Sequence, residues 1–360
     1  MLKCAGVCGA VSLLLLTGNA NSDPPEKADG PKPVLVLRAH TKAATCVRFS
    51  PCGKRLATGG LDHQAALWDA ATGKRLHAFK DHTEALLASL SFAPDGKRLA
   101  AWDRSPALNV WDAETGKRLL TLPAFPRPIF ARAEFSPDGH HLASFSMGLR
   151  DGQGDPEVLV REARSGKRVA AVHDPNGLVC GLAYAPGGKR LATCGWGGGE
   201  SVAIVWESVT GAKVLTLGKE ADAKVVYGVA FSPDGRRLAS ACLGGRVRVW
   251  ELASGATAWA RREHRAVAVR VAFSPDGRLL ASAGFDRWLT WQQAMRPEAF
   301  CPEGEVILWS AAEGKRAAVL RFGKGEAALD LAWSPDGTRL ATAHGDGTVK
   351  VWAMKDLLGK

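Results

Sequence analysis

Short segments in which apolar and polar residues alternate recur along most of this chain. RVRVW (246–250) and TVKVW (348–352) alternate with a period of two, and RLAS (237–240) is half apolar. A period of two places every second side chain on one face, as in a β-strand with one buried side. SPDG (232–235), just before RLAS, predicts a tight turn. The local pattern is therefore strand, turn, strand.

The same pattern is repeated seven times. An aromatic residue followed by Ser or Ala, Pro, one variable residue and Gly occurs at Phe49, Phe92, Phe135, Tyr184, Phe231, Phe273 and Trp333. A Trp follows downstream in six copies, at Trp68, Trp111, Trp206, Trp250, Trp309 and Trp352. In the third copy Arg161 stands at the Trp position. Because a large apolar side chain is missing there, we expect the third unit to be the least well packed.

The spacing of these landmarks shows where the repeat varies. From the aromatic to the Trp position the separation is 19 residues in four copies, but 26, 22 and 36 in copies three, four and six. From each Trp position to the next aromatic it is always 23 to 25. Each unit accommodates four strands: a ends at the aromatic, b follows the turn, c ends at Trp, and d follows a second turn. The variation in length then lies between b and c.

A pitch of 42 or 43 residues with four strands resembles the WD40 repeat family, over residues 33–354. The resemblance implies an all-β, seven-bladed β-propeller with four antiparallel strands per blade. Too few residues follow Trp352 to form a last strand d. We therefore expect Val34–Leu37 to complete the seventh blade beside strand c of Thr348–Trp352, since an open ring would leave unpaired edges.

The N-terminal residues predict an export signal. Lys3 precedes the apolar run Cys4–Thr17, and Gly18-Asn19-Ala20 has the form of a cleavage site, so residues 1–20 are interpreted as a signal peptide. Residues 21–32 are interpreted as a flexible spacer and 355–360 as a short tail. We expect a secreted or periplasmic, monomeric protein without a transmembrane segment after cleavage.

Six cysteines remain after such a cleavage, and their spacing fits neither a zinc site nor haem attachment. Cys180 and Cys194 flank one predicted hairpin and could form a disulfide in an oxidising compartment. The interpretation as small buried strand residues is better supported. We expect no metal and no cofactor.

The formal net charge of +11 is concentrated in turns. Pairs such as Lys54-Arg55 lie in the a-to-b turns and pairs such as Lys74-Arg75 in the c-to-d turns, and strand reversal puts both turn types on one face. Asp and Glu in the same turns offset much of this charge. A solvated repeat turn explains the pattern; the alternative is a basic face for a polyanion.

The resemblance also implies a structural tetrad inside a blade, made by a His before a, a hydroxyl on b, an Asp after b and the Trp on c. The first unit matches with His40, Thr58, Asp62 and Trp68, and the sixth with His264, Ser282, Asp286 and Trp309. The seventh has Thr342, Asp346 and Trp352 but lacks the His. Because the set recurs in partial form around the ring, we interpret it as structural and not as a hydrolytic triad.

Three insertions between b and c carry the candidate binding residues, at 146–157, 195–201 and 285–304. All project from the face opposite the basic turns. Aromatic and Arg side chains on loops are typical of binding hot spots. The candidates are Trp196, Phe285, Arg287, Trp288, Trp291, Met295, Arg296, Phe300, Arg150 and Asp151. Alternatively, the longest loop folds over the blade edge and caps itself.

The function that these patterns favour is a non-catalytic scaffold that binds a protein or peptide through the b-to-c loop face. One alternative is an exported propeller enzyme of the lactonase or hydrolase type, but no residue can be given a catalytic role. A second is polyanion binding by the face of the basic turns, although an export signal argues against nucleic acid as the partner.

Overall fold

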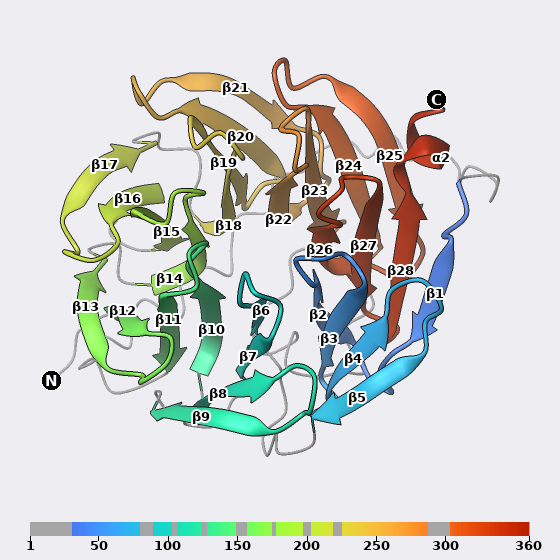
Figure 1. Cartoon of the computed structure of the whole chain (residues 1–360). Helices are drawn as coiled ribbons and strands as arrows, with labels where there is room; N and C mark the ends of the chain where they lie inside the picture. The colour runs from blue at the N-terminus through green and yellow to red at the C-terminus, as the bar shows by residue number, and fades with distance from the viewer. Residues whose placement is uncertain are drawn as a thin grey trace, which may run out of the picture.

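The computed structural model describes residues 31–79, 89–102, 107–123, 128–148, 157–174, 178–196, 203–218, 225–286 and 303–359. Seven four-stranded antiparallel sheets, here called blades, surround a common axis (Figure 1). The all-β, seven-bladed propeller predicted from the sequence is thus confirmed. Blades are numbered by their innermost strand a, in chain order.

In blades 1 to 4 the four strands follow one another from the axis outward. Their bounds are β2 (Ala44–Phe49), β3 (Arg55–Gly60), β4 (Ala65–Asp69) and β5 (Arg75–Phe79); β6 (Ser89–Phe92), β7 (Arg98–Trp102), β8 (Ala107–Asp112) and β9 (Arg118–Pro123); β10 (Pro128–Phe135), β11 (His141–Gly148), β12 (Glu157–Glu162) and β13 (Arg168–His173); β14 (Leu178–Tyr184), β15 (Arg190–Trp196), β16 (Ala203–Glu207) and β17 (Lys213–Leu217).

Blades 5 and 6 have the same order, and blade 7 takes its outer strand from the start of the chain. The bounds are β18 (Val226–Phe231), β19 (Arg237–Cys242), β20 (Arg246–Glu251) and β21 (Thr257–Arg262); β22 (Val267–Phe273), β23 (Leu279–Phe285), β24 (Gly304–Ser310) and β25 (Arg316–Phe322); β26 (Ala328–Trp333), β27 (Arg339–His344), β28 (Thr348–Ala353) and β1 (Leu35–Arg38). A five-residue helix, α2 (Met354–Leu358), follows β28.

The ring closes as the sequence predicted. Strand β1 pairs antiparallel with β28, with Leu35 opposite Val351 and Arg38 opposite Thr348. The side chain of Leu37 is 4% exposed and belongs to the apolar cluster between blades 7 and 1. The first described strand therefore supplies both the outer edge of blade 7 and part of its core.

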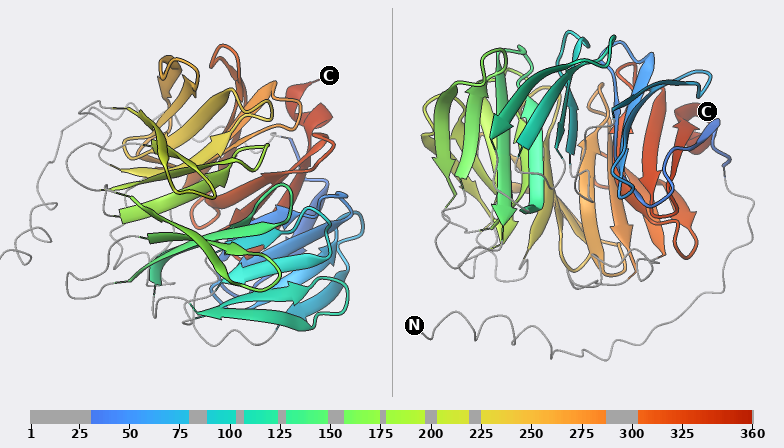
Figure 2. Two further views of the ribbon diagram at one scale, coloured as in Figure 1. Left: turned by 60° about the vertical axis from the view of Figure 1, so that its left-hand side comes forward. Right: turned by 90° about the horizontal axis from the view of Figure 1, so that it is seen from below.

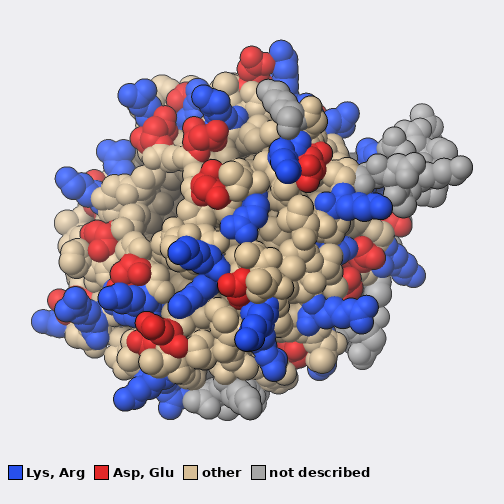
Figure 3. All heavy atoms as spheres, turned by 45° about the vertical axis from the view of Figure 1, so that its right-hand side comes forward, with Lys and Arg blue, Asp and Glu red and all other residues tan. Residues whose placement is uncertain are grey.

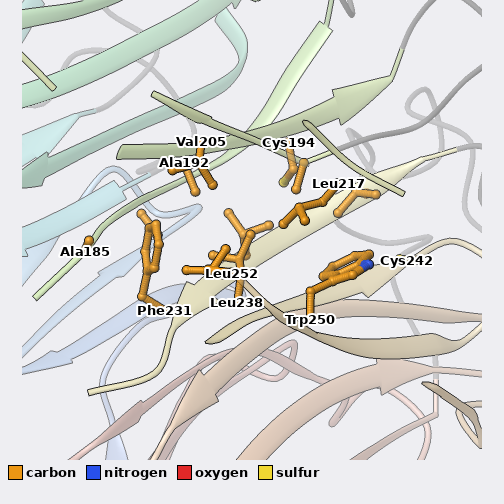
Figure 4. Close-up of a cluster of buried hydrophobic side chains, with 14 residues drawn as sticks. Ala185, Ala192, Cys194, Val205, Leu217, Phe231, Leu238, Cys242, Trp250 and Leu252 are labelled. Carbon is orange, nitrogen blue, oxygen red and sulfur yellow. The ribbon is translucent and has the colours of Figure 1, made fainter. Parts of the chain in front are cut away.

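The core lies between blades, where the faces of neighbouring sheets pack on each other. Figure 4 shows the cluster between blades 4 and 5, in which Phe231, Leu238 and Trp250 of blade 5 face Val205 and Leu217 of blade 4. Burial of this apolar area stabilises the ring by about 25 cal/mol per Å². Each blade needs both neighbours to bury its two faces.

The SPDG turns are fixed by their own side chains. In blade 7 the Ser334 hydroxyl donates to Asp336 at 2.5 Å and accepts from the backbone N–H of Arg339 at 2.9 Å. Asp336 also accepts from the backbone N–H of Thr338, and these bonds lower its pKa to about 2. The glycine that ends the turn, Gly337, has φ +70°, a conformation that Gly adopts without strain. The acidic residue of the turn thus serves the turn itself.

The a-to-b and c-to-d turns lie together on one face of the ring, along the upper edge in the right-hand view of Figure 2. A backbone bond joins them in blade 1, from Ala70 N–H to the carbonyl of Lys54 at 2.9 Å. Lys and Arg on the surface drawn in Figure 3 are dispersed, with Asp and Glu between them.

In several blades the Arg that begins strand b links one blade to the next. Arg339 of blade 7 donates to the carbonyls of Ala70 and Gly53 in blade 1, at 3.0 and 2.9 Å, and its guanidinium lies 5.2 Å from the ring centre of Phe49. Arg98 makes the equivalent contacts with blade 3, including the ring of Phe135 at 5.3 Å. These arginines act between blades, so they add little to a free basic face.

Candidate functional site

The candidate site is the base of the blade 6 insertion, on the face opposite the basic turns. Phe285 ends β23 and lies opposite both Val267 of β22 and Gly304 of β24. Trp196 likewise ends β15, opposite Leu178. These two residues mark where two of the three insertions leave their blades.

Most of the predicted binding residues fall outside the described part of the chain. These are Arg150, Asp151, Arg287, Trp288, Trp291, Met295, Arg296 and Phe300. Of the insertion between Phe285 and Gly304, the structure therefore describes the two ends.

The two ends of this insertion are joined by hydrogen bonds into a neck. The backbone N–H of Asp286 donates to the carbonyl of Glu303, and the N–H of Glu303 donates to Oδ1 of Asp286, both at 3.1 Å. The N–H of Ala266 donates to the carbonyl of Phe285 at 3.1 Å. Since β23 and β24 stay paired up to Phe285 and Gly304, the loop starts from a rigid base.

A small hollow of about 50 Å³ adjoins the neck. Its wall combines the half-buried ring of Phe285 with charged groups of both signs. Arg265 and Glu303 approach to 3.6 Å across its rim, and both are more than half exposed, so this pair contributes little to stability. The remaining lining residues are Asp286, Gly304, Glu305, Arg321 and Phe322.

Beneath the hollow, the blade 6 tetrad differs from the one predicted. Nε2 of His264 lies 2.7 Å from the Ser282 hydroxyl, to which Trp309 donates at 2.8 Å. The carboxylate near Nδ1 of His264 comes from Glu305 on strand c, at 3.3 Å, and the Asp286 carboxylate instead caps the neck. The prediction of Asp286 as the fourth member was therefore wrong.

In blade 1 the four predicted side chains form one buried chain of hydrogen bonds. His40 contacts Asp62 through Nδ1 at 2.8 Å and Thr58 through Nε2 at 3.0 Å, and Trp68 donates to the Thr58 hydroxyl at 2.8 Å. Burial would raise the pKa of Asp62, but bonding to His40 holds it below its ordinary value. Thr58 is fully buried and its oxygen is shared by two partners, so it is not placed to attack a substrate.

Three other blades form similar hydrogen bonds to the strand b hydroxyl with different residues. In blade 4 the Thr193 hydroxyl donates to Asp174, which stands where blade 1 has His40. In blade 7 His344, two residues after Thr342 on the same strand, contacts its hydroxyl at 2.7 Å. In blade 3 Arg161 donates to the Ser144 hydroxyl at 3.0 Å, as the Trp does elsewhere.

Sequence reasoning missed a second group of functional interest. The residues one and three positions before the aromatic share one side of strand a, beside the innermost strand of a neighbouring blade. In four blades these positions carry charge, and we call this group the axis cluster: Arg48 of blade 1, Arg132 and Glu134 of blade 3, Arg270 of blade 6 and Asp330 of blade 7. Polar residues on alternate positions of a were the signal that could have revealed it.

Asp330 holds the axis cluster together. Its carboxylate is 2% exposed and lies 2.6 Å from the Arg48 guanidinium and 3.2 Å from that of Arg270, and it accepts from the backbone N–H of Val47 at 3.1 Å. Burial would raise the pKa of Asp330, but the charges of Arg48, Arg270 and Arg132 hold it below its ordinary value. Asp330 is thus an anion under ordinary conditions.

The two blade 3 members are less well compensated. Burial raises the pKa of Glu134 to about 7, against a bond from the backbone N–H of Tyr184 at 3.2 Å. Burial and the nearby charges of Arg270 and Arg48 lower the pKa of Arg132 to about 9, although Asp330 opposes this. Nη2 of Arg132 is buried without a hydrogen-bond acceptor among the described residues.

The described residues hold no group of three or more His, Cys, Asp or Glu arranged for a metal ion. Cys180 and Cys194 are both buried in the structure, and Cys180 occupies a bulge between Val179 and Gly181. Within the described part of the chain, no helix is long and apolar enough to span a membrane.

Comparison with known proteins agrees with the fold. The WD domain, G-beta repeat family matches residues 31–69, 211–251, 261–290 and 319–353, which is less than half of the chain. The segment 211–251 includes β17 of blade 4 and three strands of blade 5, so one sequence repeat spans two blades. Protein Mut11 of Chlamydomonas reinhardtii is 42% identical over 64 residues, covering 16% of this chain and 17% of that relative.

Proposed function

We propose that this protein is a WD40-type, non-catalytic scaffold, and that a protein or peptide partner binds the face carrying the b-to-c insertions, with blade 6 as its centre. The observation that carries the proposal is the neck at Asp286 and Glu303, which fixes both ends of a 16-residue segment (287–302) to a rigid blade. A loop on a rigid base loses less entropy when it binds than a wholly mobile one does.

The composition of that segment supports binding. It contains Trp288, Trp291, Met295 and Phe300 together with Arg287 and Arg296. Trp and Arg are enriched among the residues that dominate binding energy at interfaces. The hollow beside Phe285 would give an apolar anchor an adjoining pocket with both signs of charge at its rim.

A matched pair of variants tests the proposal. Trp288→Ala with Trp291→Ala removes two candidate anchors from the loop, and Arg236→Ala removes an exposed charge from the opposite face. Chemical crosslinking and affinity capture from the source's extracytoplasmic fraction should recover a protein with the wild type and with Arg236→Ala, but not with the double variant. Equal recovery with all three proteins would reject blade 6 as the centre of binding.

The location that we propose with this function is outside the cytoplasm, on the basis of residues 1–20. Fractionation of cells that express the full chain checks it: a mature protein that begins near Asn21, found outside the cytoplasm, is the expected result.

Polyanion binding by the turn face has weaker support. Arg55, Arg98, Arg237 and Arg339 all donate to carbonyls of a neighbouring blade, and the turn carboxylates remain charged beside the remaining bases. A face of this kind has little net field to steer an anion.

A further inference from the structure

The axis cluster is a site in its own right, separate from the proposed binding face. Its members come from blades 6, 7 and 1, which follow one another around the closed ring, and from blade 3, which is not next to any of them. Arg48 and Arg270 both contact Asp330, and the charges of Arg48, Arg270 and Asp330 all act on Arg132. The innermost strand of blade 3 faces those of blades 6, 7 and 1 across the axis (Figure 1).

The cluster has too little negative charge for its cations. Three guanidinium groups share one permanent carboxylate, Asp330, whose oxygens are already used by Arg48, Arg270 and the Val47 N–H. Glu134 accepts from the backbone of Tyr184, so part of its bonding capacity is also used. Burying a cation without an adequate partner is costly, which makes an uncompensated guanidinium unusual in a core.

Two of the cations remain reachable. The side chains of Arg48 and Arg270 are 29% and 23% exposed, and Arg132 is half-buried although its Nη2 is enclosed. The lone pairs of Asp330 satisfy only part of their donors, since a guanidinium carries five N–H groups. A small group that approaches along the axis therefore meets N–H donors of Arg48 and Arg270, with Arg132 of blade 3 close enough for its charge to act on them.

We propose that the axis cluster binds an oxyanion, a carboxylate or a phosphate, through Arg132 with Arg48 and Arg270. Planar guanidinium donors match the oxygens of both groups, and such charge-assisted bonds are about twice as strong as neutral ones. Binding supplies the acceptor that Nη2 of Arg132 lacks. The site does not depend on the blade 6 insertion, so it stands whether or not that loop binds a partner.

The test uses two probes and two variants. The probes are inorganic phosphate, and a capped Gly-Glu-Gly peptide compared with its Gln counterpart, each added at constant ionic strength set with sodium chloride. Arg132→Met removes the charge but keeps most of the volume, and Arg236→Met removes an exposed charge as the control. Melting temperature and calorimetric titration are measured for the full chain.

Arg132→Met should have opposite effects on the two measured quantities: it raises the melting temperature and weakens anion binding. Without a probe, Arg132→Met should melt at a higher temperature than the wild type, because an uncompensated buried charge is removed. With a probe, the wild type and Arg236→Met should gain stability. Arg132→Met should bind the probe at least about tenfold more weakly than the wild type does. Binding of phosphate alone identifies a free anion as the ligand, and binding of the Glu peptide but not the Gln peptide identifies an acidic side chain.

Two outcomes overturn the proposal. One is that neither phosphate nor the Glu peptide stabilises the wild type. The other is that Arg132→Met responds to them as fully as the wild type does, which would place any anion binding elsewhere on the surface.

Discussion

At the scale of single residues, one hydroxyl on strand b organises the interior of most blades, but its partners change. Thr58 is bonded by His40, Thr193 by Asp174 and Thr342 by His344. The sequence identified the hydroxyls and tryptophans because these keep their spacing within the repeat. It missed Asp174 because an acid stands there in place of the His, and it missed His344 and Glu305 because they reach the same point in space from strands b and c.

The hydroxyl of Thr58 should be needed for the stability of blade 1. Thr58→Val keeps the volume but leaves the Trp68 N–H and a nitrogen of His40 without their partner, so we expect a loss of about 2 kcal/mol. Thr58→Ser, which keeps the oxygen, is the control and should lose less than half as much. Urea unfolding followed by Trp fluorescence measures both; equal losses would mean that packing, not bonding, matters at this position.

His344 should make stability depend on pH. Burial lowers its pKa to about 4, against 6.5 for an ordinary His, while Nδ1 donates to the carbonyl of Glu326 at 2.6 Å. The unfolded chain therefore binds more protons between these values, so stability falls as pH drops from 6.5 to 4, by about 3 kcal/mol at the lower end.

The variant His344→Gln tests the origin of this dependence. It should be less stable than the wild type at pH 7 but should lose less stability on acidification, as urea midpoints at pH 7 and pH 4.5 would show. The same slope in both proteins would assign the effect to other groups.

At the scale of elements, the residue type at the end of strand b in blades 1 and 6 depends on the His side chain that packs against it. A Cβ on Gly60 would lie 2.5 Å from Cγ of His40, and one on Gly284 would lie 2.4 Å from Nδ1 of His264. The histidine ring can reach its hydroxyl only because these positions carry no side chain. Blades 1 and 6 thus need Gly at this position for space and not for backbone conformation.

Gly60→Ala should destabilise the protein by about 2 kcal/mol or more, because the added methyl displaces the His40 ring from Thr58 and Asp62. Gly187→Ala is the matched control, since no atom lies within 4 Å of its added Cβ. Thermal unfolding compares the two, and a Gly60 variant as stable as the Gly187 variant would contradict the steric explanation.

The boundaries of the strands were predictable from the sequence where the repeat is regular, but the axis cluster was not. The aromatic and the Trp mark the ends of strands a and c in nearly every unit, and the turn chemistry between them is local. The axis cluster has no repeated signature, because its members come from four different units and form a site only when the ring brings them together. Local patterns determine the strands, whereas assembly determines the charged site.

At the scale of the whole molecule, stability depends on the seam between β1 and β28. Both faces of every blade are covered only while the ring is closed, and the seam is made by a four-residue strand with Leu37 buried in the adjoining cluster. The ring is therefore only as stable as this short pairing.

Deleting Val34–Arg38 should cost several kcal/mol and cause aggregation, because it exposes the edge of β28 and the apolar side chains that Leu37 covers. Leu37→Ala should lose about 2 to 4 kcal/mol, and Val36→Ser, at a position 49% exposed, should lose almost nothing. Melting temperature and size-exclusion chromatography measure these effects. An unchanged melting temperature after the deletion would show that the seam does not hold the ring.

The antiparallel pairing of β1 with β28 also brings the two ends of the propeller to the same side of one blade. A short linker between them, with new ends opened in the c-to-d turn of blade 5 near Gly255, would yield a circular permutant in which β21 becomes the first strand and takes over the role of β1. Such a rearranged gene product should fold to the same ring, because every sector of this architecture can serve as the place where the chain begins.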